Sequence, residues 1–170
     1  MRTIGTHTRV ASFVGAVALL VQISPALASN GHDNNRPVDI TFTKWAAPPP
    51  AVLPIPFFGL FEGFAGDGLL GSFDAEVLWR QMSVNGHVTG LEAMYEVVDG
   101  DRSFTALIRG GMNAAGAAQL DGFILAGWRA GARVRVVFQR HLASEGGCVA
   151  APFGKTCFEG TIHVGRAPRD

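Results

Sequence analysis

The sequence has no run of basic residues, and its 14 Lys and Arg are balanced by 14 Asp and Glu. Binding to nucleic acid or to an anionic lipid surface relies on clustered Lys and Arg, so this balance argues against both partners. The sequence also lacks the H-x-x-x-H and C-x-x-C spacings typical of zinc sites, and it has no G-x-S-x-G motif. We therefore expect no metal and no cofactor. Because no catalytic motif is found, the sequence leaves open whether the protein is an enzyme.

Cysteine is scarce, since only Cys148 and Cys157 occur in the whole chain. In an oxidising compartment, an even pair at such close spacing is most simply a disulfide. The bond would close a loop of about ten residues and stabilise the fold by roughly 2 to 3 kcal/mol on the chain-entropy account. We therefore predict a Cys148–Cys157 disulfide.

Long apolar runs are lacking as well. The uncharged stretch from Val10 to Ile23 is about 14 residues long, whereas a membrane-spanning helix needs roughly 20. Arg2 and Arg9 precede this stretch and Ala26-Leu27-Ala28 follows it, which is the order of features in a secretory signal peptide. We predict that residues 1–28 are a signal peptide, that the mature protein has no stable membrane span, and that it is secreted or periplasmic. The mature chain would keep 12 basic residues (14 − 2) against 14 acidic ones.

Proline divides the rest of the chain into two parts. Ala46 to Pro56 holds five prolines in eleven residues, whereas none occurs from Phe57 to Ala151. Proline lacks a backbone donor and fixes φ, so the first part should be extended and irregular. We expect residues 29–56, including a short β-like run from Val38 to Trp45, to form a polar and Pro-rich N-terminal arm. Residues 57–170 should then form a single folded domain.

Within the proline-free part, apolar residues recur with the period of two that is typical of β-strands. The alternating apolar sets are Phe73, Ala75, Val77 and Trp79; Leu91, Ala93, Tyr95 and Val97; Phe104, Ala106 and Ile108; Leu120, Ile124, Ala126 and Trp128; Val134, Val136 and Phe138; and Phe158, Ile162 and Val164. Turn signals such as Asn85-Gly86 separate the runs. Because closure buries one face and removes exposed edges, we predict an all-β fold with a single antiparallel up-and-down barrel of about seven to eight strands. A two-sheet β-sandwich is the alternative.

The polar side chains of these runs carry both signs of charge and include Glu76, Arg80 and Glu92. If their face points to solvent, cross-strand ion pairs are expected there, each worth roughly 0.2 to 1 kcal/mol. If it lines the barrel lumen, Glu76 or Glu92 beside Tyr95 could serve as a general acid or base. These three residues are the candidate catalytic residues.

The aromatic side chains of the apolar sets suit two roles. They can fill the core, or they can line a cavity for an apolar molecule. For a ligand-binding barrel, we expect the lining to include Trp79, Tyr95, Phe104 and Trp128.

Four segments carry a resemblance to known proteins: Gly71 to Leu78, Tyr95 to Val97, Arg102 to Ala106, and Cys157 to Ile162. Their glycine spacing and strand rhythm resemble small secreted bacterial β-barrel proteins and, more remotely, the allene oxide cyclase and dirigent barrel group. The resemblance implies an eight-stranded barrel, in a group whose members act on or guide small apolar molecules. The Gly-Gly-Thr-Gly-Arg/Lys-Phe/Tyr segment of that group is missing here, so no catalytic residue is carried over.

Three functional hypotheses follow. The first is a barrel that binds a small apolar ligand, which we favour. The second is a cyclase or isomerase-like enzyme that uses the barrel carboxylates. The third is an envelope or extracellular interaction module, in which the Pro-rich arm or a sheet edge meets a partner. The sequence leaves the oligomeric state open.

Overall fold

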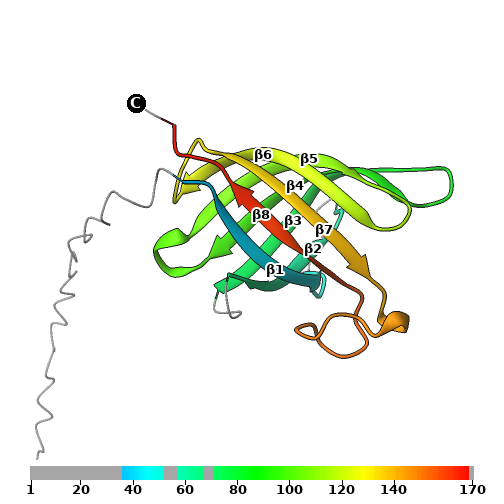
Figure 1. The fold of residues 1–170 in the computed structure, drawn as a ribbon. Coiled ribbons are helices and arrows are strands. Elements are labelled where there is room, and N and C mark those ends of the chain that lie inside the picture. Colours follow the sequence, from blue (N-terminus) through cyan, green and yellow to red (C-terminus); the bar gives the residue numbers. More distant parts are fainter. Residues whose placement is uncertain (1–35, 52–56, 67–70, 169–170) are drawn as a thin grey trace, which may run out of the picture. The chain divides into compact units, whose positions relative to one another are not determined.

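The computed structural model describes residues 36–51, 57–66 and 71–168, which all belong to one compact unit of the chain. The predicted signal peptide, residues 1–28, lies outside the described residues. Eight antiparallel strands form a closed barrel in chain order (Figure 1), which confirms the predicted up-and-down barrel rather than the sandwich. The strands are β1 (Val38–Ala46), β2 (Leu60–Ala65), β3 (Gly71–Met82), β4 (Val88–Val98), β5 (Phe104–Met112), β6 (Ala117–Gly127), β7 (Arg133–His141) and β8 (Cys157–Val164). In the part of the chain that is described, no helix is long and apolar enough to span a membrane.

The first strand closes the barrel. β1 pairs with β2 on one side and with β8 on the other, in a register that runs from Val38 opposite Val164 to Trp45 opposite Cys157. The barrel therefore begins at Val38, and the predicted domain boundary at Phe57 is wrong. The physical reason is that β2 and β8 would otherwise each present an unpaired edge, and β1 satisfies the hydrogen bonds of both.

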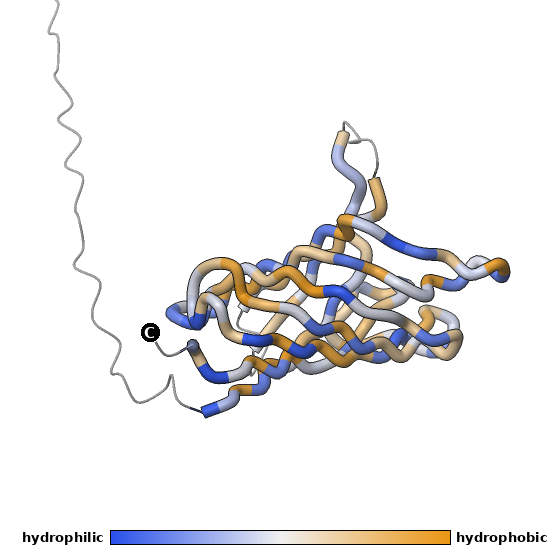
Figure 2. Tube along the Cα trace, turned by 90° about the horizontal axis from the view of Figure 1, so that it is seen from above, coloured by the Kyte–Doolittle hydropathy of each residue, from blue (hydrophilic) through white to orange (hydrophobic). Residues whose placement is uncertain are grey.

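Side-chain alternation fills the lumen with apolar residues, and Figure 2 shows hydrophobic and hydrophilic residues alternating along the strands. Buried apolar side chains come from all eight strands, as in a small barrel whose interior is packed. They include Phe73, Tyr95, Val97, Ile108, Leu120, Ile124, Val136, Ile162 and Val164. The predicted apolar face is thus the inner face along most of the barrel.

A β-bulge in β3 breaks this alternation. Val77 pairs with Ala93, but Trp79 pairs with Glu92, so one extra residue is inserted between the two pairs. An extra residue reverses the direction of every side chain that follows it. Trp79 is consequently 39% exposed on the outer surface, where the Arg109 guanidinium lies 5.5 Å from its ring centroid. The prediction that Trp79 lines the lumen is therefore wrong.

The loop between β7 and β8, residues 142–156, is fastened by the predicted Cys148–Cys157 disulfide, which the structure confirms with a Cα–Cα distance of 6.0 Å. Both cysteines pack with Trp45 in a small apolar cluster separate from the main core. The Trp45 indole donates a hydrogen bond of 2.8 Å to Glu62 Oε1. This cluster covers the outer face of β1 at Trp45. The preceding residue, Lys44, points the other way, into the lumen.

Several strand glycines lie where an adjacent strand passes too close for any side chain. A Cβ atom added at Gly122 would lie 1.9 Å from the backbone oxygen of Leu107, and one at Gly160 would lie 2.1 Å from that of Val137. Such glycines mark the sharp bends that a small, strongly coiled barrel requires.

We expect Gly122→Ala to destabilise the barrel clearly more than Gly86→Ala. The first substitution forces a backbone shift, whereas Gly86 has a positive φ of +76° but no atom within 4 Å of its added Cβ, so its cost should be about 1 kcal/mol. Urea unfolding of both variants measures the difference. Equal losses in the free energy of unfolding would contradict the close approach at Gly122.

Candidate functional site

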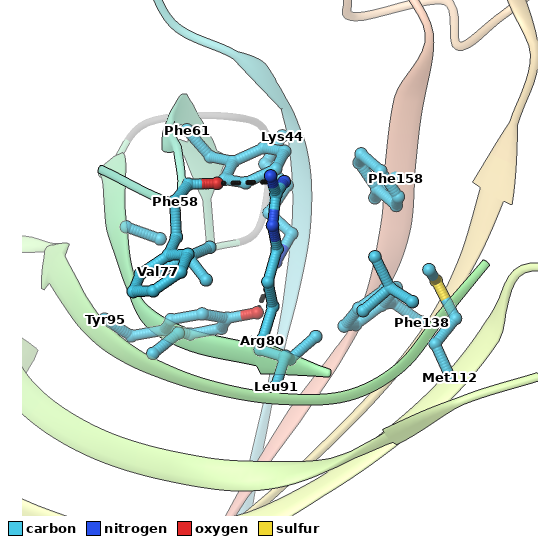
Figure 3. Close-up of a pocket in the computed structure, with 13 residues that line it drawn as sticks. Lys44, Phe58, Phe61, Val77, Arg80, Leu91, Tyr95, Met112, Phe138 and Phe158 are labelled. Atoms are coloured by element: carbon cyan, nitrogen blue, oxygen red, sulfur yellow. Dashed lines mark hydrogen bonds between the residues drawn. The ribbon is translucent and has the colours of Figure 1, made fainter. Parts of the chain in front are cut away.

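A pocket of about 110 Å³ lies in the barrel lumen, and most of its lining is apolar. Figure 3 shows its walls, with the Arg80 side chain extending across it. The lining residues are Lys44, Phe58, Phe61, Ala75, Val77, Arg80, Val88, Leu91, Ala93, Tyr95, Met112, Phe138 and Phe158. Lys44, Arg80 and Tyr95 are the ionisable members, and no carboxylate of the described residues is among them. Because Arg80 is exposed, its position indicates where the pocket meets solvent.

Lys44 is the unusual residue of this pocket. It is 5% exposed, and its Nζ donates a hydrogen bond to Oη of Tyr95, which is also buried. β1 places it there because Lys44 continues the inward alternation of Ile40 and Phe42. In the described part of the chain, the ammonium group has no carboxylate within ion-pair distance.

Six aromatic rings surround the Lys44 nitrogen. Their centroids lie 4.4 Å (Phe138), 4.5 Å (Tyr95), 5.4 Å (Phe61), 5.5 Å (Phe42), 5.5 Å (Phe73) and 5.8 Å (Phe158) from Nζ. The rings hold one another in edge-to-face contacts, such as Phe73 against Tyr95 at 4.7 Å and 82°. An aromatic cage of this kind attracts a cation through the ring quadrupoles, and it supplies no counter-charge.

Burial decides the protonation states of the pair. It lowers the pKa of Lys44 from 10.5 to about 7, because desolvation disfavours the charged ammonium. It raises the pKa of Tyr95 above its usual value near 10, because desolvation disfavours the phenolate. At neutral pH the site therefore holds a substantial fraction of unprotonated amine beside a protonated phenol. A neutral amine is a nucleophile and a base, whereas a phenol hydroxyl can donate a proton or a hydrogen bond.

The predicted catalytic residues are not brought together. Glu76 is exposed, and its position between the inward-facing Ala75 and Val77 puts it on the outer face. Glu92 is half-buried opposite Trp79 and Arg109, likewise on the outer face. Only Tyr95 lies in the lumen, and its polar neighbour is Lys44 rather than a carboxylate.

Of the four predicted lining residues, Tyr95 alone lines this pocket. Phe104 is buried, but it begins β5, and the pocket is lined by Met112 at the other end of that strand. Its ring lies 6.4 Å from that of Trp128, so these two aromatics pack together away from the pocket. The predicted lining by Phe104, Trp128 and Trp79 is therefore wrong for this pocket.

One group of potential metal ligands occurs among the described residues. Atoms of His141, Cys148 and Glu159 lie within 4.8 Å of one another on the side of the barrel that carries the disulfide. The sulfur of Cys148 is bonded to Cys157, so it cannot act as a thiolate ligand. Two ligands remain, which is fewer than zinc sites use.

The site contains two residues that the sequence analysis does not assign to it, Lys44 and Arg80, and the sequence contains a signal only for Lys44. In the run Val38, Ile40, Phe42, Lys44, a lysine stands where the alternation requires an apolar residue. Arg80 reaches the pocket because of the bulge in β3, which an alternation of unbroken period two does not reveal.

The chain matches no family model, no curated protein and no solved structure. Fold and site alone therefore define its class, which is an eight-stranded antiparallel barrel with a lysine–tyrosine pair in its lumen.

We expect the stability of the protein to rise with pH between about 7 and 10, and Lys44→Met to remove that rise. In this window the folded state has released the Lys44 proton, while the unfolded state still holds it, so raising the pH favours folding. The slope should approach about 1.4 kcal/mol per pH unit. Above about pH 10 the unfolded Tyr95 ionises before the folded one, which opposes the trend.

Urea unfolding at a series of pH values measures this effect. Lys155→Met is the matched control, because Lys155 is a half-exposed lysine beside Glu62, and its loss should leave the rise intact. Lys44→Met should also be more stable than the wild type at pH 7, because an apolar chain replaces a desolvated amine. An unchanged rise in Lys44→Met would contradict the lowered pKa of Lys44.

Proposed function

We propose that the barrel binds a small, largely apolar molecule in its lumen, with the polar end of that molecule at Lys44 and Tyr95. The observation that carries this proposal is an apolar pocket that reaches solvent and contains one buried, hydrogen-bonded polar pair. Binding sites for small molecules combine apolar walls with a few placed polar groups in this way.

The cost of Lys44 supports a functional role. A buried lysine without a carboxylate partner destabilises the folded state at neutral pH by an amount on the order of several kcal/mol. Phe42, two residues earlier on the same face of β1, is a buried apolar side chain, as the alternation would also place at position 44. A lysine kept where an apolar residue would be more stable suggests that function, rather than packing, requires the amine.

The size of the pocket limits the ligand. A cavity of roughly 150 Å³ accepts a benzene ring, and the pocket of about 110 Å³ is somewhat smaller. A short alkyl chain or part of a small ring fits inside it. A longer group would extend past Arg80, whose guanidinium donates a hydrogen bond of 3.4 Å to the backbone oxygen of Phe58.

We also propose that the protein works outside the cytoplasm. Support comes from the order of charged, apolar and small residues in positions 1–28. The Cys148–Cys157 disulfide is compatible with an oxidising compartment.

We expect hexan-1-ol and benzyl alcohol to raise the thermal unfolding midpoint of the wild type, because a ligand that binds only the folded state stabilises it. Leu91→Trp should abolish most of that shift by filling the pocket. Leu125→Trp makes the same change at a residue that is 53% exposed, so it should keep the wild-type shift. A shift that is absent from the wild type, or equal in all three proteins, would contradict binding in the lumen.

A further inference from the structure

Lysine and tyrosine, the two residue types of the buried pair, are rare in this chain. Tyr95 is the sole tyrosine, and Lys155 is the only other lysine. Lys155 lies on the surface, with Nζ 3.2 Å from the backbone oxygen of Ala46 and 3.9 Å from Glu62. The chain thus contains one lumenal and one surface lysine, which differ sharply in their surroundings.

We propose that Lys44 captures the carbonyl group of a small apolar aldehyde or ketone as a reversible imine. This inference rests on the proposed binding function and adds the chemical class of the ligand's polar end. The geometry that supports it is an amine that lines an apolar pocket and contacts a phenol hydroxyl.

The environment of Lys44 favours this reaction. Its pKa of about 7 leaves much of the amine unprotonated at neutral pH, as nucleophilic attack requires. No carboxylate of the described residues lines the pocket, so none holds the amine in its charged form. Desolvation in a hydrophobic pocket is a general way to activate a lysine for imine formation.

Imine formation at Lys44 is balanced in atoms and electrons by the amine, the carbonyl group, the Tyr95 hydroxyl and water. The Nζ lone pair attacks the carbonyl carbon, the C–O π electrons move to oxygen, and the Tyr95 hydroxyl is placed to donate a hydrogen bond or proton to that oxygen. Proton transfer from nitrogen to oxygen gives a carbinolamine. Loss of one water molecule, which carries away the carbonyl oxygen, leaves the C=N bond. Addition of water reverses the sequence and releases the ligand, so no oxidant or reductant is required.

The aromatic cage favours a carbonyl ligand over a carboxylate. The centroids of six rings lie 4.4 to 5.8 Å from Nζ, and ring faces carry negative electrostatic potential. Among the described residues that line the pocket, only Lys44 and Tyr95 offer donors at its buried end, so a carboxylate placed there would be poorly solvated among these rings. A protonated imine is a cation at the same nitrogen, and it keeps the cation–π contacts that the ammonium has.

Reductive trapping tests the proposal. Purified wild-type protein is incubated at pH 7.5 with hexanal or benzaldehyde and sodium cyanoborohydride, which converts an imine to a stable secondary amine. Intact mass spectrometry counts the adducts, and peptide mapping separates Lys44 from Lys155 and from the N-terminal amine. We expect adduct formation at Lys44 to be roughly tenfold faster than at Lys155, because desolvation leaves much of the Lys44 amine unprotonated and the pocket holds the aldehyde beside it.

Two variants make the assignment independent of mapping. Lys155→Arg leaves Lys44 as the only lysine and should keep the fast adduct, whereas Lys44→Arg should lose it. Lys155→Arg alters only the surface, so it keeps the test informative even where Lys44→Arg fails to fold. Unfolding in urea should reduce the reactivity of Lys44 to that of Lys155.

The outcomes separate this inference from the proposed function. Equal trapping at both lysines, or no trapping at Lys44, would overturn imine formation. If benzyl alcohol still raised the unfolding midpoint in that case, lumenal binding would stand with a ligand that does not react. If the alcohols gave no shift either, both proposals would be overturned.

Discussion

The pairing of β1 with β8 is the constraint on which the rest of the structure depends. It converts an eight-stranded sheet into a closed barrel, and closure creates a lumen from which water can be excluded. The same pairing carries Lys44 to the centre, opposite Phe158 of β8 and beside Tyr95 of β4. The Cys148–Cys157 bond covers the outer face of β1 through Trp45, so it supports the strand that carries the lysine.

Closure also explains why the lysine is costly. Inside the barrel, the amine has exchanged water for aromatic rings and a single hydroxyl. Burial favours the neutral form of both members of the pair. It lowers the pKa of Lys44 and raises that of Tyr95. Each residue is thereby driven toward its neutral form. The pair can satisfy part of its hydrogen bonding internally without an ion pair, which keeps the pocket free of fixed negative charge.

The sequence was sufficient to predict the barrel, its apolar inner face and the disulfide, because alternation and cysteine spacing are local signals. The eight strands are also what the resemblance to small secreted barrels implies, although that resemblance itself stays a prediction. The site was harder to predict for physical reasons. The bulge in β3 puts Trp79 on the outer face and Arg80 in the pocket, and the prolines that follow β1 are typical of an arm rather than of a barrel strand. Lys44 lies before the prolines, outside the proline-free part in which the alternation predicts the barrel strands.

The position of Lys44 within the barrel bears on what the pocket can select. Arg80 stands at the solvent edge and is exposed, whereas Lys44 and Tyr95 are buried deeper. A charged ligand would meet Arg80 first, where water screens the interaction, and would then have to lose its hydration to reach Lys44. A neutral ligand with one polar group avoids most of that penalty. It also gains apolar burial along Phe61, Leu91 and Phe138. The order of groups along the pocket therefore favours ligands that are neutral on entry and acquire charge, if at all, only at the lysine nitrogen.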